Sequence, residues 1–183
     1  MLSALDPQSV DTKNINRVLQ APLKPEVSAN FAFQNNSDGT SYQSAGVSAS
    51  KLFAPTVKIF GGADSAFLHA TAASGFSAIN GNSEVTYNRA WLGAKKALNE
   101  NFEVDAMGGG GQTAFHNNGI YEVGLNYWQG NQFNGRLSHR QDLLTVSPLA
   151  ASMGILRNSN RIEGNWMPDY KNTIASSFNY DTY

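Results

Sequence analysis

The side chains that could do chemistry are carboxylates, arginines and amides that recur at alternate positions along short runs of polar and apolar residues. Because successive side chains of a β-strand point to opposite faces, such residues share one face. Mixed acids, bases and amides suit the wall of a hydrated conduit for a polar polymer, because they offer many replaceable hydrogen bonds. The residues predicted to face this lumen are Glu103, Asp105, Glu122, Asn126, Arg136, Arg140, Arg161 and Glu163.

The same residues also have a simpler interpretation as ion pairs. Glu122 with Arg136, and Arg161 with Glu163, would neutralise one another as neighbours on the strands, and this is the better interpretation for any single residue. The carboxylates of this face would in principle supply the acid pair of a glycosidase. Carboxylates on adjacent strands are too common for that pattern to indicate an enzyme, so we predict no catalytic residue.

Neither a metal site nor a cofactor is predicted. His69, His116 and His139 are scattered without the spacing of metal ligands. The run Gly108–Gly111 is not followed by the Lys-Ser/Thr and helix of a phosphate loop. The formal net charge of -1 gives no electrostatic argument for a nucleic-acid partner.

The composition favours an all-β protein. Aromatic residues make up 11% of the chain and charged residues only 15%, whereas a disordered chain is poor in aromatics and rich in charge. The chain has 17 glycines and no cysteine, and its mean hydropathy is -0.35. The absence of cysteine suits a bacterial cell-envelope protein that avoids unwanted disulfides.

The alternation of polar and apolar residues predicts about nine strands. They are expected near 26–34, 41–52, 56–64, 83–95, 102–110, 119–128, 133–140, 161–166 and 173–180. Residues 1–25 are expected to form a linker or a short helix, and residues 26–183 a partial transmembrane β-barrel. The predicted fold is thus an antiparallel up-and-down meander, incomplete as a barrel, with unpaired edges near 27–33 and 174–180.

The lengths of the expected connections point to a membrane. Connections near 53–55, 98–101, 129–132 and 168–171 are short, and those near 35–40, 65–82, 111–118 and 141–157 are longer. This alternation is typical of outer-membrane barrels, which have short periplasmic turns and long outer loops. The apolar face would then contact lipid. The residues expected to point away from the concave side are Tyr121, Val123, Leu125, Ile174 and Phe178.

Aromatic residues and one arginine refine this prediction. Trp91, Trp128 and Trp166 are expected in an interfacial girdle near the short turns, together with Tyr127. Arg89 does not fit, because it shares the parity of Trp91 and would face lipid. A β-bulge or a position near the lipid headgroups is the expected explanation.

One run of residues resembles a known family. Residues 140–154, with Ser-Pro-Leu at 147–149, precede a strand, a turn at Asp169 and a further strand. This arrangement is similar to the outer-membrane porins that export exopolysaccharide in the secretion of cellulose and poly-N-acetylglucosamine. The resemblance implies a C-terminal barrel fragment, outer-membrane lipid and a polysaccharide chain as partners, and contacts with a periplasmic tetratricopeptide region and an inner-membrane synthase. This chain shows no such repeat, and about nine strands are too few for the sixteen that this family closes, so it is expected to be truncated at both ends.

Three functions compete at this point. The expected function is a segment of an outer-membrane porin that exports exopolysaccharide, located in the bacterial outer membrane. The second is a soluble β-rich carbohydrate-binding or adhesin module, whose inner face would also be apolar. The third is an outer-membrane enzyme or receptor built on the same barrel.

Overall fold

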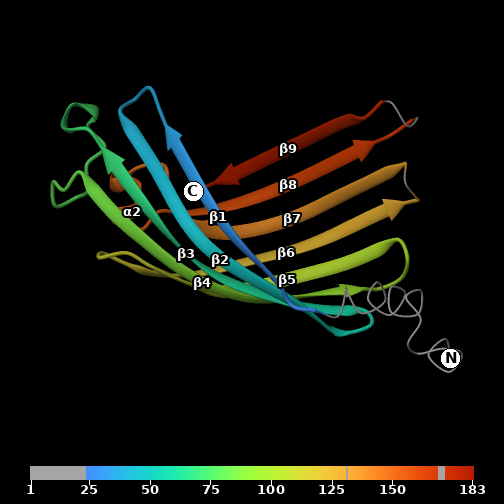
Figure 1. Ribbon diagram of the computed structural model, residues 1–183. Helices are drawn as coiled ribbons and strands as arrows, with labels where there is room; N and C mark the ends of the chain where they lie inside the picture. The colour runs from blue at the N-terminus through green and yellow to red at the C-terminus, as the bar shows by residue number, and fades with distance from the viewer. Residues whose placement is uncertain (1–23, 131, 169–171) are drawn as a thin grey trace, which may run out of the picture.

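The described residues form one antiparallel sheet in which every strand pairs with its neighbours in sequence (Figure 1). The computed structural model describes residues 24–130, 132–168 and 172–183. Within them the sheet has 9 strands and is not closed, so the predicted incomplete up-and-down meander is confirmed. The strands are β1 (Glu26–Asn35), β2 (Thr40–Ala54), β3 (Val57–Ala70), β4 (Glu84–Ala97), β5 (Phe102–Gln112), β6 (Asn117–Gln129), β7 (Phe133–Leu143), β8 (Leu156–Trp166) and β9 (Ile174–Thr182).

Two short helical elements lie in the connections at one end of the sheet. They are η3 (Ala72–Ser74), between β3 and β4, and α2 (Pro148–Ser152), between β7 and β8. The linker or helix expected over residues 1–25 lies, up to residue 23, outside the described residues. In the described part of the chain, no helix combines the length and the apolar character needed to cross a membrane.

The connections gather at two ends, as the meander requires. On the right in Figure 1 lie the connections 55–56 and 98–101 and the facing ends of β6, β7, β8 and β9. The connections on the left span 36–39, 71–83, 113–116 and 144–155. The left end therefore carries both long loops. The expected strict alternation of short and long connections is wrong, because 36–39 and 113–116 are as short as 98–101.

Longer strands are the reason for this difference. β3 continues to Ala70, although the sequence from Ser65 onward was expected to be a loop. Its small residues have no clear period, yet the ladders with β2 and β4 pair their backbone groups as far as His69 and beyond. β8 likewise begins at Leu156 within the expected loop. Backbone pairing with two neighbours thus overrides weak local signals.

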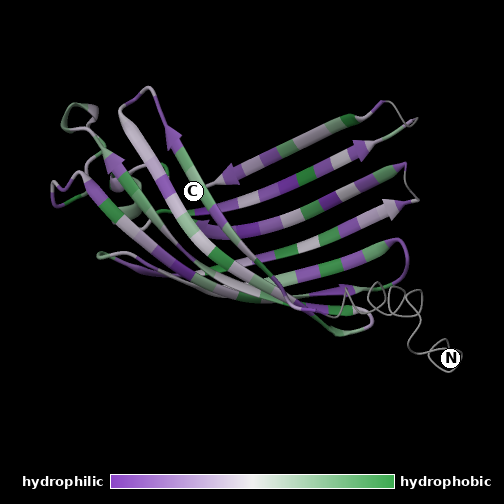
Figure 2. Cartoon of the chain, in the orientation of Figure 1, coloured by the Kyte–Doolittle hydropathy of each residue, from purple (hydrophilic) through white to green (hydrophobic). Residues whose placement is uncertain are grey.

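One face of the sheet carries exposed apolar side chains. Cross-strand partners lie on the same face, so register defines rows across the sheet. One such row joins Val104, Leu125, Leu137, Ile162 and Phe178 through successive partners on β5 to β9. The last three are exposed by 53%, 54% and 63%. Figure 2 shows the underlying alternation of hydrophobic and hydrophilic residues along the strands.

A small hydrophobic core lies at the end with the long loops. Its buried members include Leu68 and Tyr87 from the sheet and Ala151 from α2. The hydroxyl of Ser152 accepts a hydrogen bond from the backbone N–H of Ile79, 3.0 Å away, so the loops 71–83 and 144–155 are joined. These loops cover the end of the sheet and supply the apolar groups that its strands alone lack.

The connection 36–39 is closed by a carboxylate. The Asp38 side chain accepts hydrogen bonds from the hydroxyl of Thr40 at 2.6 Å and from its backbone N–H at 2.9 Å. The hydroxyl bond and then the backbone bond hold the pKa of the Asp38 carboxyl below its ordinary value. The turn is therefore capped by an ionised side chain at neutral pH.

Candidate functional site

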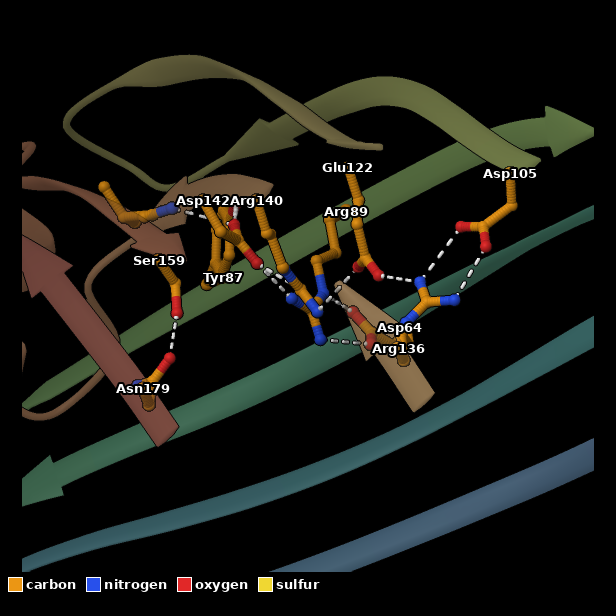
Figure 3. A network of polar contacts seen from close by, with 11 residues as sticks. Asp64, Tyr87, Arg89, Asp105, Glu122, Arg136, Arg140, Asp142, Ser159 and Asn179 are labelled. Carbon is orange, nitrogen blue, oxygen red and sulfur yellow. Dashed lines mark hydrogen bonds and ion pairs between the residues drawn. The ribbon is translucent and has the colours of Figure 1, made fainter. Parts of the chain in front are cut away.

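The inner side of the curved sheet is identified by a contact between strands that are not neighbours. The hydroxyl of Tyr87 on β4 donates a hydrogen bond to Asp142 Oδ1 on β7, at 2.7 Å. β5 and β6 lie between these strands in the sheet. In a flat sheet β4 and β7 would be roughly 14 Å apart. The contact requires a strong curl, with both side chains on the concave side (Figure 3).

Arg89 is the centre of this cluster. Its Nε and Nη2 donate to the two carboxylate oxygens of Asp64 on β3, at 2.6 and 2.8 Å. Its Nη1 donates to Asp142, which also accepts from Arg140 Nη2 at 2.6 Å. The side chains of the two aspartates are only 5% and 4% exposed. A two-point bond between guanidinium and carboxylate fixes orientation as well as charge, so Arg89 ties β3, β4 and β7 together.

A run of glycines allows this approach. Gly111 on β5 lies directly beneath Tyr87, and a Cβ at that position would be 2.1 Å from the tyrosine hydroxyl. Within the run Gly108–Gly111, which fits no phosphate loop, Gly111 therefore has a structural role. It leaves room for the Tyr87 ring to pass over β5 and reach Asp142 on β7.

Replacing Gly111 by alanine is expected to destabilise the fold by about 1–3 kcal/mol, because the added methyl group displaces the Tyr87 ring. Gly108→Ala is the matched control in the same strand, since a Cβ there meets nothing within 4 Å. Denaturation midpoints of the two variants, measured side by side, test this. Equal midpoints would show that Tyr87 does not need the space above Gly111.

Arg136 on β7 organises a second cluster. It donates to Asp105 Oδ1 and Oδ2 at 2.6 and 3.0 Å, reaching across β6 to β5. The same guanidinium donates to Glu122 at 2.7 Å and to Asn126 at 2.9 Å. The amide of Asn126 also donates to Asp105 at 2.9 Å and to Glu103 at 3.3 Å. Because these groups satisfy one another, they form one network.

The two clusters are joined at Arg140. Its Nη1 lies 3.8 Å from Glu122 Oε2, and its Nη2 contacts Asp142. The ion pairs therefore continue along the concave face from β3 to β7. On β8, Arg161 and Glu163 form a further pair at 2.7 Å. Glu163 is the cross-strand partner of Arg136, which places this pair on the same face.

Every residue predicted for the polar face thus lies on the concave face. One network joins Glu103, Asp105, Glu122, Asn126, Arg136 and Arg140. Among the described residues, Arg161 and Glu163 pair only with each other. The apolar residues of the same strands follow the expected pattern. They lie on the face opposite to these polar positions, and their side chains are exposed. The exposed fractions are 38% for Tyr121, 48% for Val123, 37% for Leu125, 55% for Ile174 and 63% for Phe178.

The parity predicted for β4 is wrong. Tyr87 and Arg89 were expected on the lipid side, but both reach Asp142 on the concave side. Trp91, which shares their parity, packs with Arg89, whose guanidinium carbon lies 5.8 Å from the ring centroid. Trp91 therefore does not belong to a lipid-facing girdle. The same holds for Trp128, which shares the concave parity of Asn126 on β6. Neither a β-bulge nor a position near the lipid headgroups is needed to explain Arg89, because the side chains of Tyr87, Arg89 and Trp91 all face the concave side.

Sequence reasoning missed Asp64, Arg89 and Asp142 as members of the site. Asp142 was placed in the loop expected over 141–157, whereas β7 continues to Leu143. The one available signal was Arg89, a charged residue among the alternate positions of β4 that are otherwise apolar. A charge in such a position needs a partner, so it could have indicated the site. Among the described residues, no group of three or more His, Asp and Glu residues is arranged to hold a metal ion.

A groove of about 1000 Å³ borders the first cluster. Its lining includes Asn30, Gly46, Asp64, Arg89 and Asn118. The rest of the lining is largely small and apolar, with Ala29, Ala45, Val47, Ala63 and Ala90, so the groove offers a few hydrogen-bonding groups on a mainly apolar wall. Comparisons with known proteins add no family: no family model matches the chain, and a search of curated proteins finds no match.

Proposed function

We propose that this chain forms part of the wall of a β-barrel pore in the bacterial outer membrane and that the pore exports exopolysaccharide. The observation that carries the proposal is the contrast between the two faces of one curved sheet. Exposed apolar side chains occupy the convex face, and a connected set of charged and amide side chains occupies the concave face.

The convex face supports the membrane part of the proposal. Hydrocarbon cannot form hydrogen bonds, so lipid-facing strand positions are apolar and the polar groups turn to the lumen. The row from Val104 to Phe178 meets this requirement over five successive strands. In water, a contiguous apolar surface of this kind would be an aggregation hazard. The described strands hold from 9 to 15 residues, enough for a tilted strand to cross the bilayer.

Pairing at the edges is a requirement of this proposal. In hydrocarbon, the edge backbone groups of β1 and β9 that have no partner strand among the described residues would each cost several kcal/mol. The two edges therefore pair with further strands, which closes the wall. Contacts with a periplasmic tetratricopeptide region and with an inner-membrane synthase belong to the same proposal.

The concave face supports the polymer part. A chain of sugars presents many hydroxyls, and a conduit must offer bonds that form and break as the chain advances. Asn30, Asn118 and Asn126 supply amides along this face, and the ion pairs of Arg89 and Arg136 leave the wall close to neutral. The wall thus offers exchangeable hydrogen bonds without one dominating charge.

Reconstitution into planar bilayers tests this function. The protein in detergent, with the further strands that pair with β1 and β9 present, is expected to insert and to give conductance steps that linear oligosaccharides interrupt. Stable solubility as a monomer without detergent, together with the absence of conductance, would contradict the proposal and favour the soluble carbohydrate-binding alternative. Hydrolysis of the oligosaccharides during the same assay would instead favour an enzyme built on the barrel.

A further inference from the structure

A cluster of arginines on β7 and β8 differs from the rest of the concave face. A pocket of about 400 Å³ is lined by Arg140, Arg157 and Arg161 and by Ser138, Ser159, Ser177, Asn179 and Glu122. Register places Arg140 opposite Ser159, so that Arg157 and Arg161 are its diagonal neighbours on β8. Side chains in diagonal positions are close enough to interact. Three guanidinium groups therefore surround one small polar space.

Within the described residues, Arg157 is the one arginine of this pocket without a carboxylate partner. Arg161 pairs with Glu163 at 2.7 Å and Arg140 with Asp142 at 2.6 Å, and Glu122 is held by Arg136 at 2.7 Å. Arg157 makes no side-chain hydrogen bond or ion pair within the described residues. Like charges at diagonal positions repel each other, so this arrangement becomes favourable when an anion lies between them.

A second observation points to the same ligand. Within the described residues, the buried Nε of Arg140 has no hydrogen-bond partner. The Nε itself is covered by protein atoms, whereas the Arg140 side chain as a whole is 34% exposed, so an acceptor in the pocket would reach this guanidinium through its exposed part. The hydroxyl of Ser159 donates to Asn179 at 2.8 Å, which holds further polar groups at the rim (Figure 3). Arginine suits such a ligand because its planar fork matches the oxygens of carboxylate and phosphate groups.

We infer that this arginine pocket, Arg140, Arg157 and Arg161 with its serines and Asn179, binds an oxyanion substituent of a sugar, a carboxylate or a phosphate ester. The inference rests on the proposed function and narrows it: the exported polysaccharide carries anionic groups. The pocket then binds each anionic sugar transiently as the polymer moves along the wall. The neutral network around Arg136 provides weaker contacts between such binding sites.

Titration calorimetry on the detergent-solubilised full chain tests the pocket without requiring a pore. The probes are hexagalacturonate for carboxylates, glucose 6-phosphate for phosphate esters and maltohexaose as the neutral control. Hexagalacturonate or glucose 6-phosphate is expected to bind, and the tighter of the two identifies the substituent. Maltohexaose is expected to bind at least about tenfold more weakly, because it lacks the charge-assisted hydrogen bonds. Equal binding of all three probes would overturn the inference.

Two variants localise the binding. Arg157→Gln is expected to weaken anion binding by at least about tenfold and to leave the melting temperature unchanged, because Arg157 makes no ion pair within the described residues. Lys95→Gln is the control. It removes a cation from another part of the concave face, where the Lys95 ammonium lies 3.8 Å from the Glu103 carboxylate. Equal losses in both variants, or no loss in Arg157→Gln, would refute the pocket. Anion binding without conductance would overturn the pore, and conductance without anion selectivity would overturn only the pocket.

Discussion

Replacing Asp142 by alanine is expected to lower the free energy of unfolding by about 3–5 kcal/mol. The carboxylate is 4% exposed and accepts from Arg89, Arg140 and Tyr87. Its removal leaves Arg89 with one carboxylate where it had two. The Tyr87 hydroxyl also loses its acceptor on β7, so the curl of the sheet loses the contact that joins β4 to β7.

Chemical denaturation of the protein in detergent micelles measures this loss. Glu163→Ala is the matched control, because Glu163 also pairs with an arginine on the concave face. Both members of that pair are more accessible, with side chains 33% and 55% exposed. Exposed pairs contribute about 0–1 kcal/mol, so Glu163→Ala should change stability little. Similar losses in the two variants would show that the contact from β4 to β7 does not hold the curl.

The alternation of side chains made the C-terminal strands predictable. In β6 and β7 most polar positions face the network and most apolar positions face outward, as at Glu122 and Val123, although His139 lies beside Val123 on the outer face. The reason is local, since the period of a strand is fixed at two residues. The meander followed as well, because short connections leave neighbouring strands little choice but to pair.

The parity of β4 was unpredictable for a physical reason that lies outside the strand. Near the long loops, the concave face is covered by α2 and becomes a small apolar core around Leu68, Val85 and Tyr87. The apolar side chains of a strand therefore face the concave side near these loops and the convex side elsewhere in the sheet. No window of the sequence shows which loop covers which strand, so the rule that holds for β6 fails for β4.

The contacts of Arg89 were hidden for a related reason. Asp142 lies 53 positions further along the chain than Arg89, and the two meet only because the sheet curls over β5 and β6. The curl depends on Gly111, where a side chain would obstruct Tyr87. Glycine in a strand signals a close approach of some group, but the sequence does not say which group approaches.

Replacing Leu125 by arginine is expected to reduce the stability of the membrane-inserted protein by about 2–4 kcal/mol. Leu125 lies in the apolar row of the convex face, between Val104 and Leu137 in the register. If this face contacts hydrocarbon, the guanidinium at that depth has no water and no partner. If the face contacts water instead, a surface substitution of this kind changes stability by only about 0.5 kcal/mol.

Met107→Arg is the matched control on the concave face. Met107 pairs across the strands with Glu122, so an arginine there meets water and a carboxylate. Refolding into lipid vesicles, followed by denaturation, compares the two variants with the unchanged protein. A loss for Leu125→Arg alone identifies the convex face as the one in lipid, because the same side chain was added in both variants and only its surroundings differ. A loss for Met107→Arg alone would mean that the concave face is the dry one, and the pore would have to be abandoned.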